Sequence, residues 1–254
     1  MPGRLTVVGL GIGLSAHVTY EAQQALRHAD RVFHLAGEVV QGLWVQQQNP
    51  QATALDDCYA EGTARKDTYA EMTRRIIQAV REGHHVVAAF YGHPGIGVDA
   101  AHAAIAQARA EGFEATMQPG VSAGDCLVAD LGIDPFTTGW QAHEAWRFVE
   151  SRPRFEPTCP LVLWQIGLVY QSSINFDAKP NRRGLRAITA TLLETYASTH
   201  EVVLYEASPY PITSSRLEHL PLSALPKADV NFGTTLYVPP RATRRRPARR
   251  TKTR

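Results

Sequence analysis

Short apolar runs alternate with helix-like patterns along this chain, and no other feature constrains its fold as strongly. The runs RLTVVGL, RVFHLA and HVVAAFY are each followed by a stretch with helical character. Later strand-like runs are FEATMQP, PLVLWQIG, EVVLYEA and TTLYVP, and helical patterns cover residues 15–28, 38–48, 97–111, 122–131 and 184–198. Alternation of this kind is typical of α/β proteins with a largely parallel sheet.

A break near QPGVSAG, at residues 118–124, divides the chain into two halves of similar length. We therefore expect two α/β domains, residues 1–118 and 119–240, followed by a basic tail at 241–254. Three stretches are predicted to be loops because they are rich in polar or small residues: 49–66, 151–160 and 176–184.

The last fourteen residues, RATRRRPARRTKTR, contain eight Lys or Arg and no acid, so the net charge of +2 is misleading. Without them, 18 of the 26 basic residues remain against 24 acidic ones. The rest of the chain is therefore acidic, which argues against nucleic-acid binding as its main function. The tail has no apolar periodicity and is predicted to be disordered, although it could bind an acidic partner electrostatically.

The sequence gives no indication of a membrane span, a secretory route or a metal centre. No apolar run reaches the ~18 residues of a span, and the N-terminus lacks the usual signal-peptide pattern. Cys58, Cys126 and Cys159 are too scattered for a disulfide framework or a zinc site, so a cytoplasmic location is expected. His84 and His85 are adjacent and would point to opposite faces of an extended chain, which does not suit a metal site.

The helix after the first long loop is well marked. Thr68 and Glu71 fit the S/T-x-x-E capping box, which predicts a helix N-terminus at this point. One apolar face is predicted by residues that recur at spacings of three and four: Tyr69, Met72, Ile76 and Val80. Gly83 is expected to end the helix. Arg65, four residues before Tyr69, is expected to reach the same region from the loop.

Two glycine-containing motifs suggest functions that their surroundings do not support. GLGIG at 9–13 follows a strand, but the dinucleotide fingerprint needs a third glycine where Leu14 stands, and the next strand does not end in an acid. A tight loop close to a ligand is the better interpretation. GVSAG resembles the hydrolase motif G-x-S-x-G, yet Pro119 precedes it and no Asp-then-His order follows at a suitable spacing. Ser122 fits better as a helix N-cap.

A group of polar aromatic residues remains. Tyr59, Arg65 and Tyr69 lie around the first long loop, and Tyr91 lies at the end of the strand HVVAAFY. By periodicity alone Tyr69 is a core aromatic, and Arg65 alone is a surface cation. Tyr91 opens the motif YGHPG, which is either a plain strand-to-helix turn or one wall of a ligand pocket at the carboxyl edge of a sheet.

The motifs VVGLGIG, YGHPG, PGVSAGDCLVADLGIDP, LWQIG and TTLYVPP occur in the order and spacing of the tetrapyrrole methylase superfamily. The chain most resembles, over about residues 4–240, the methyltransferase domain of borosin peptide backbone α-N-methyltransferases. The resemblance implies two α/β domains of the class III methyltransferase type, with S-adenosylmethionine bound in the cleft between them. Corrin-modifying members usually carry Pro-Gly-Asp where this chain has IGLS, so the resemblance favours the borosin type.

The resemblance also implies which residues act. Tyr59, Arg65 and Tyr69 match the spacing of the borosin tyrosine–arginine–tyrosine group, Tyr91 matches its strand-end tyrosine, and Asp56 replaces a further tyrosine. We expect Tyr69 to act as the base, with Arg65 favouring its phenolate. Tyr59 and Tyr91 are expected to donate hydrogen bonds to the amide oxygen. The positions that match cofactor contacts are Tyr91, His93, Ile96, Ser122, Ala123, Gln165, Thr234 and Thr235.

Fused borosins carry their acceptor peptide at the C-terminus, whereas this chain has no apolar tail after its last strand-like run. The resemblance therefore implies a separate precursor peptide as the acceptor, and relatives that pair imply a homodimer. Two alternatives stay open. One is a methyltransferase of the same superfamily that acts on a tetrapyrrole or another small molecule. The other is a non-catalytic protein that binds a partner through its basic tail.

Overall fold

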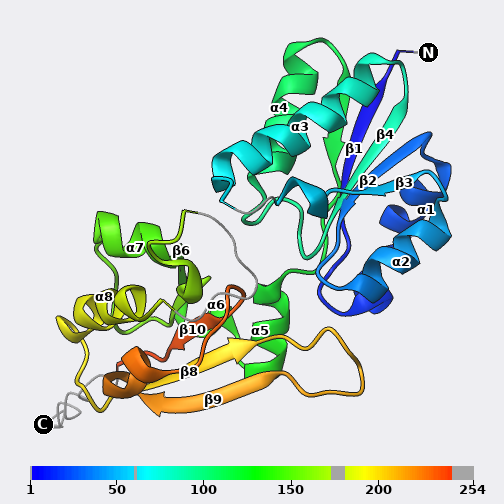
Figure 1. Ribbon diagram of the computed structural model, residues 1–254. Helices are drawn as coiled ribbons and strands as arrows, with labels where there is room; N and C mark the ends of the chain where they lie inside the picture. The colour runs from blue at the N-terminus through cyan, green and yellow to red at the C-terminus, as the bar shows by residue number, and fades with distance from the viewer. Residues whose placement is uncertain (1, 60–61, 173–180, 242–254) are drawn as a thin grey trace, which may run out of the picture. The chain divides into compact units, whose positions relative to one another are not determined.

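The protein is represented by a computed structural model that describes residues 2–59, 62–172 and 181–241 (Figure 1). The chain forms two compact units. The first unit consists of the described residues within 1–133, 171–177 and 206–216. The second unit consists of those within 134–170, 178–205 and 217–254.

The predicted domain division after residue 118 stays a prediction. The first unit continues through helix α5 (Ala123–Leu131), which follows that point in the chain. The basic tail lies, from residue 242 onwards, outside the described residues.

The first sheet is parallel throughout, which confirms the α/β prediction. Its order is β3-β2-β4-β1-β5, and Val7 of β1 lies opposite Ala88 on one side and Met117 on the other. The strands are β1 (Arg4–Gly9), β2 (Arg31–Leu35), β3 (Ala52–Ala54), β4 (His85–Phe90) and β5 (Glu114–Met117). Parallel sheets are usually covered on both faces, which explains why β4 is almost uniformly apolar.

Helices cover both faces of this sheet (Figure 1). One face carries α1 (Tyr20–His28) and α2 (Val39–Gln48), and the other carries α3 (Arg65–Arg81) and α4 (Asp99–Ala110). Val87 of β4 packs in the same core as Leu26 of α1, whereas its neighbour Val86 packs in the core of Ile76 on α3. Because successive strand residues point to opposite faces, β4 contributes to both cores.

The second sheet is mixed, with the order β6-β7-β10-β8-β9. Strand β6 runs parallel to β7, and β10 is antiparallel to both β7 and β8. The strands are β6 (Gln141–Glu144), β7 (Leu161–Trp164), β8 (Glu201–Glu206), β9 (Arg216–Pro221) and β10 (Thr235–Val238).

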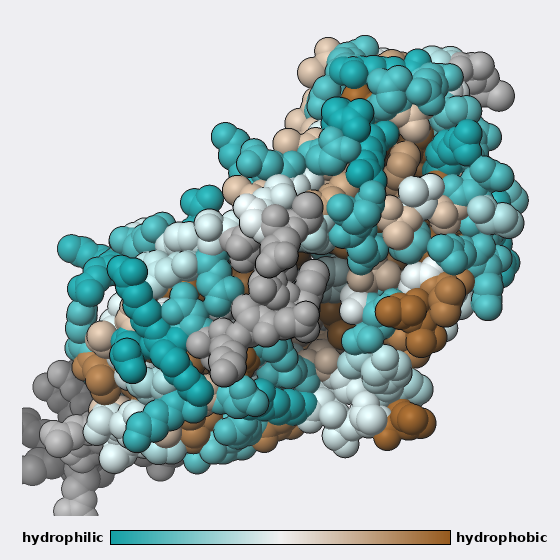
Figure 2. Space-filling model, in the orientation of Figure 1, coloured by the Kyte–Doolittle hydropathy of each residue, from teal (hydrophilic) through white to brown (hydrophobic). Residues whose placement is uncertain are grey.

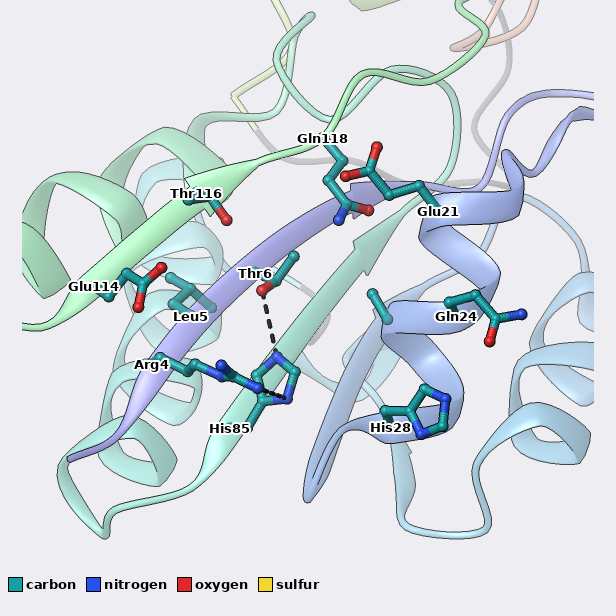
Figure 3. A pocket seen from close by; sticks show the side chains of 11 residues that line it. Arg4, Leu5, Thr6, Glu21, Gln24, His28, His85, Glu114, Thr116 and Gln118 are labelled. Carbon is teal, nitrogen blue, oxygen red and sulfur yellow. Dashed lines mark hydrogen bonds between the residues drawn. The ribbon is translucent and has the colours of Figure 1, made fainter. Parts of the chain in front are cut away.

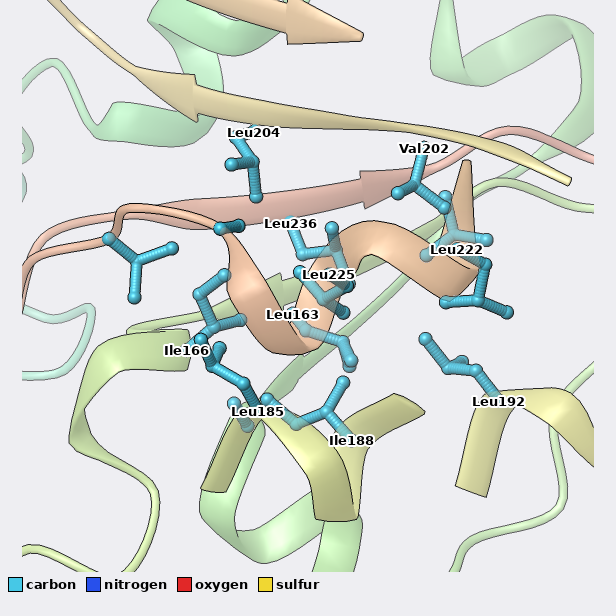
Figure 4. Packing of buried hydrophobic residues seen from close by; sticks show 14 of the residues in the cluster. Leu163, Ile166, Leu185, Ile188, Leu192, Val202, Leu204, Leu222, Leu225 and Leu236 are labelled. Carbon is cyan, nitrogen blue, oxygen red and sulfur yellow. The ribbon is translucent and has the colours of Figure 1, made fainter. Parts of the chain in front are cut away.

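Helices α7 (Ala145–Ser151) and α8 (Arg182–Leu193) and the 3₁₀ turn η4 (Leu222–Lys227) pack on this sheet, and the short helix α6 (Pro135–Thr138) precedes β6. Figure 4 shows this core, in which Leu163, Leu204 and Leu236 come from the sheet. Ile188 of α8 and Leu225 of η4 are completely buried in the same cluster.

Several local predictions are wrong. Helix α3 begins at Arg65, and the hydroxyl of Thr68 donates to the Ala64 carbonyl from inside the helix, so Thr68 is not the N-cap. The segment 49–66 contains β3 and the 3₁₀ turn η2 (Asp56–Cys58) instead of being only a loop. The last predicted helix ends at Leu193, earlier than expected. A three-residue strand such as β3 is too short to show an alternating pattern.

Other helix ends confirm the predictions. Ser122 is the N-cap of α5: its hydroxyl accepts from the N–H of Asp125 at 3.2 Å, and the Asp125 carboxylate accepts from the N–H of Ser122 at 2.7 Å. Gly83 follows α3 with φ of 91°, a left-handed conformation that glycine adopts without steric cost.

The surface in Figure 2 is mostly hydrophilic. No helix of the described part of the chain is both long enough and apolar enough to cross a membrane. Cys58, Cys126 and Cys159 are free thiols. Within the described ranges, no group of three or more His, Cys, Asp or Glu side chains is arranged to hold a metal ion.

Candidate active site

Three loops meet in backbone contact at the carboxyl ends of β1 and β4, and glycines make this contact possible. Gly11 and Gly92 exchange two backbone hydrogen bonds, of 3.2 and 2.9 Å. A Cβ atom on Gly9 would lie 2.5 Å from the carbonyl oxygen of Gly92 and 3.0 Å from the Cα of Gly120. No larger residue fits such an approach without a shift of backbone. The motifs GLGIG, YGHPG and QPGVSAG therefore form one junction at this edge of the sheet.

The structure brings the predicted tyrosine–arginine group together in the first unit. Tyr91 directly follows β4, and its N–H donates to the carbonyl of Leu35 at the end of β2, at 2.9 Å. Tyr59 follows η2 and packs with Tyr69 against the core below α3. Arg65 is the first residue of α3 and not part of a loop, so its spacing of four from Tyr69 places both on one helix face.

Tyr69 and Arg65 act electrostatically on Tyr59 and Tyr91. Burial raises the pKa of Tyr59, the neighbouring Tyr69 and Tyr91 raise it further, and a side-chain hydrogen bond with Tyr69 adds to this. Tyr91 is 37% exposed as a residue, but the atoms packed around its phenol group still raise its pKa by desolvation, and Tyr69 again adds to the rise. The positive charge of Arg65 opposes the rise in both cases. Tyr59 and Tyr91 are therefore neutral hydrogen-bond donors at neutral pH.

The turn after Tyr91 holds further predicted residues close to the start of α5. The Nδ1 of His93 accepts from the N–H of Gly95 at 2.9 Å, so the ring proton is assigned to Nε2. Burial raises the pKa of the Asp125 carboxyl. Hydrogen bonds from Ser122, together with the electrostatic effect of the nearby His93, outweigh burial and bring this pKa below its usual range. Ile96 is 56% exposed and presents an apolar surface at the same turn.

Asp125 lies among the candidate site residues, and the sequence reasoning did not identify it. It caps α5 with Ser122 next to Ala123, the first residue of the helix, and its pKa responds to His93. An acidic residue three positions after a predicted N-cap serine is a recognisable signal, and it could have identified Asp125.

The remaining predicted residues lie together in the second unit, where β7 ends and β10 begins. Gln165 has φ of 57° and ψ of 45°, a left-handed conformation that is uncommon outside glycine. The N–H of Ile166 donates to the carbonyl of Thr234 at 3.0 Å, and the Thr234 hydroxyl accepts from the N–H of Asn231 at 2.8 Å. Thr234 and Thr235 are almost completely buried. These contacts hold a strained backbone, which is a frequent feature of functional sites.

A pocket of about 350 Å³ extends along the first sheet beside α1, from the amino ends of β1 and β4 to Gln118, which follows β5 (Figure 3). The amino ends of β1 and β4, strand β5 and one side of α1 line it. The imidazole of His85 lies 3.3 Å from Nη2 of Arg4 and 3.4 Å from Oγ1 of Thr6. None of the predicted site residues, all of which the structure describes, lines this pocket. It is therefore separate from the tyrosine–arginine group.

The parallel first sheet, the mixed second sheet and the glycine junction define an α/β protein of the tetrapyrrole methylase type. The uroporphyrin-III-C-methyltransferase of Thermus thermophilus has a similar fold, with a TM-score of 0.67 at 19% identity over 94% of this chain and 93% of that one. The family model for tetrapyrrole (corrin/porphyrin) methylases matches residues 4–208, and the chain belongs to this family.

Two relatives are more similar in sequence. A methyltransferase and type I borosin cyclic peptide precursor of Coprinopsis marcescibilis is 36% identical over 246 residues, which cover 94% of this chain and 63% of that protein. A methyltransferase and omphalotin A precursor of Omphalotus olearius is 34% identical over 245 residues, covering 94% and 58%. The chain thus spans about three-fifths of the length of these relatives.

Proposed function

We propose that this protein is an S-adenosylmethionine-dependent methyltransferase whose acceptors are backbone amide nitrogens of a peptide. The observation that carries the proposal is the group of Tyr59, Arg65, Tyr69 and Tyr91, in which Tyr69 and the Arg65 guanidinium lie close enough to act on the pKa values of Tyr59 and Tyr91. The choice of a peptide acceptor is supported by similarity to relatives whose names combine a methyltransferase with a borosin peptide precursor.

The residues at the predicted contact positions fit S-adenosylmethionine, which would supply an electrophilic methyl group on a sulfonium. The exposed Ile96 offers an apolar surface, and Ser122 and Ala123 begin α5, whose first turn is capped by the side chains of Ser122 and Asp125. The strained Gln165 is a position where backbone groups can face a ligand. The proposed contacts are Tyr91, His93, Ile96, Ser122, Ala123, Gln165, Thr234 and Thr235.

Tyr69 takes the proton of the acceptor amide. An amide nitrogen is a poor nucleophile because its lone pair is delocalised into the carbonyl, so the N–H proton must leave. A free phenol has a pKa of about 10 and is too weakly ionised to act alone. Arg65, one helical turn away, stays charged and favours the phenolate of Tyr69. No carboxylate of the described residues forms an ion pair with Arg65, so none there competes for its charge.

Tyr59 and Tyr91 stabilise the charge that moves onto the amide oxygen. Their raised pKa values keep both phenols protonated, so each has one proton to donate, and that of Tyr59 turns from Tyr69 to the amide oxygen when the peptide binds. Donors that are already in place when negative charge develops lower the barrier without further reorganisation. In this proposal Tyr69 acts as the base, and Tyr59 and Tyr91 act as hydrogen-bond donors.

Mass spectrometry of peptides incubated with the protein and S-adenosylmethionine tests the proposal, and mass gains of one methylene unit on backbone amides are expected. Tyr69→Phe and Arg65→Ala should each lower the rate by about 10²–10⁴, while the affinity for the cofactor stays within a few-fold. The double variant should be little worse than the worse single variant. Tyr20→Phe is the matched control, because Tyr20 is a 77% exposed phenol on α1.

Two results would contradict different parts of this proposal. Near-normal turnover by Tyr69→Phe would make Tyr69 a packing residue and remove the proposed base. Calorimetry that detects no binding of S-adenosylmethionine would remove the methyltransferase function itself. A methylated tetrapyrrole, with peptides left unchanged, would favour the small-molecule alternative.

The acceptor is proposed to be a separate precursor peptide, although the names of both relatives join enzyme and precursor in one protein. Methylation of a peptide added to the 254-residue chain would support this proposal, and methylation confined to a longer form of the chain itself would contradict it. A homodimer and a cytoplasmic location stay predictions from the sequence.

A further inference from the structure

A network of ion pairs joins the 3₁₀ turn η2 to helix α3. Nη1 of Arg75 donates to both carboxylate oxygens of Asp57, each at 2.8 Å, and its Nε donates to Oε1 of Glu71 at 2.8 Å. Arg74 holds Glu71 from the other side, with two hydrogen bonds of 2.7 Å. The Arg75 side chain is 28% exposed, so this guanidinium is partly shielded from water.

We propose that Asp57, Arg75 and Glu71 form a clasp that positions Tyr59 against Tyr69 for methyl transfer. This inference rests on the proposed function, in which Tyr59 donates to the amide oxygen. None of the three clasp residues touches the reacting atoms, so Arg75 and Asp57 are positioning residues.

The clasp acts on Tyr59 through the backbone. Tyr59 is the residue directly after η2, and its N–H donates to the carbonyl of Asp56 at 3.0 Å. Arg75 and Tyr69 belong to the same helix, about 9 Å apart along its axis at 1.5 Å per residue. A helix is stiff over that distance. The ion pair between Asp57 and Arg75 therefore fixes the position of Tyr59 along the α3 axis relative to Tyr69. The hydrogen bond between the two phenols requires that alignment.

Glu71 and Arg75 are both charged at neutral pH. The guanidinium of Arg74, followed by that of Arg75, lowers the pKa of Glu71 to about 2. Hydrogen bonds to Glu71 and Asp57 raise the pKa of Arg75. Exposed ion pairs contribute little to global stability, so loss of this network should affect the position of η2 more than the folding of the unit.

Cys58 provides a readout that is independent of catalysis. It lies inside η2, it is only 6% exposed, and its Sγ lies 4.0 Å from Oδ1 of Asp57. Release of η2 from α3 would expose this thiol. The rate at which iodoacetamide alkylates Cys58, followed by peptide mass spectrometry, therefore reports on the clasp, with Cys159 as the internal reference for reagent activity.

The main variant is Arg75→Gln, and Arg81→Gln is its matched control. Arg81 lies on the same helix and donates to Glu111 with bonds of 2.8 and 2.6 Å, but it does not touch η2. Arg75→Gln should speed Cys58 alkylation about tenfold or more through exposure of the thiol, although loss of the Arg75 charge, which lowers the Cys58 pKa, acts in the opposite direction. It should also lower kcat by about 10–100-fold, with KM and cofactor affinity within about threefold, because small misplacements cost rate more than binding. Arg81→Gln should leave all of these values within about twofold.

Equal Cys58 alkylation in Arg75→Gln and the unchanged protein would overturn the clasp, and so would equal effects of Arg75→Gln and Arg81→Gln. If Arg75→Gln fails to fold, Asp57→Asn gives the same test, because it keeps the pair of Arg75 with Glu71. If the unchanged protein transfers no methyl group to peptides, the proposed function is wrong. The rate of Cys58 alkylation would still show whether the clasp holds η2 against α3.

Discussion

Replacement of Gly9 by alanine should disrupt the junction of the three loops. The new Cβ atom would lie 2.5 Å from the Gly92 carbonyl oxygen, 2.9 Å from Cδ of Pro94 and 3.0 Å from Cα of Gly120. Ordinary contacts begin near 3.4 Å, so the Gly92 carbonyl would have to move by about 1 Å. Two of the three obstructing atoms belong to backbone, which cannot rotate out of the way as a side chain can.

The cost of Gly9→Ala follows from those contacts. Overpacking of a well-packed site costs about 1–3 kcal/mol. The required shift also loosens the two hydrogen bonds between Gly11 and Gly92, and a single such bond contributes about 1 kcal/mol. We expect a loss of about 2–4 kcal/mol in the free energy of unfolding, which for a chain of this size lowers Tm by about 4–16 °C.

Thermal unfolding followed by circular dichroism, with and without S-adenosylmethionine, measures this effect. Gly9→Ala should have a lower Tm than the unchanged protein, and addition of the cofactor should raise its Tm by less. Gly37→Ala is the control, because its Cβ would first meet Tyr91 at an ordinary 3.5 Å, and it should melt within about 2 °C of the unchanged protein. A Gly9→Ala variant that melts like that control would refute the close packing of the junction.

Two further predictions concern single groups. Burial lowers the pKa of His34 in the folded protein, and the smaller effect of Asp56 opposes this shift. Below pH ~6.5 the unfolded chain therefore binds more protons at His34 than the folded chain does. The free energy of unfolding should for this reason fall as the pH is lowered from 7 to 5. Urea titrations should show this slope, reduced in His34→Gln; an unchanged slope would contradict it. Ser122→Ala should cost about 0.5–2 kcal/mol by removing the cap of α5, and an unchanged melting temperature would show that the cap is redundant.

The alternation of apolar runs determined the α/β class, because the longer strands and helices of the first unit each carry a local apolar pattern. HVVAAF is apolar on both faces because both faces of β4 are covered. The apolar pattern of this run is visible in the sequence. The short strands β3 and β6 and the six-residue strand β9 escaped prediction. Strands β3 and β6 have three and four residues, and their position depends on the neighbouring strand rather than on a pattern of their own.

The start of α3 shows where local signals mislead. Thr68 and Glu71 have the spacing of a capping box, but Thr68 is 2% exposed and lies within the helix, while Glu71 binds Arg74 and Arg75. The helix begins one turn earlier, where the N–H of Arg65 donates to the carbonyl of Ser172, a residue far away in the sequence. A long-range contact therefore decided a boundary that the local pattern placed elsewhere.

The candidate site divides in the same way. The sequence by itself determined that Arg65 and Tyr69 lie four residues apart and that Tyr91 ends a buried strand, because spacing and apolar pattern are local properties. Only the tertiary structure decided that Tyr59 reaches Tyr69, because η2 is held against α3 by Asp57 and Arg75. The pKa values of Tyr59 and Tyr91 depend on burial and on charges from distant parts of the chain, and these exist only once the sheet has assembled.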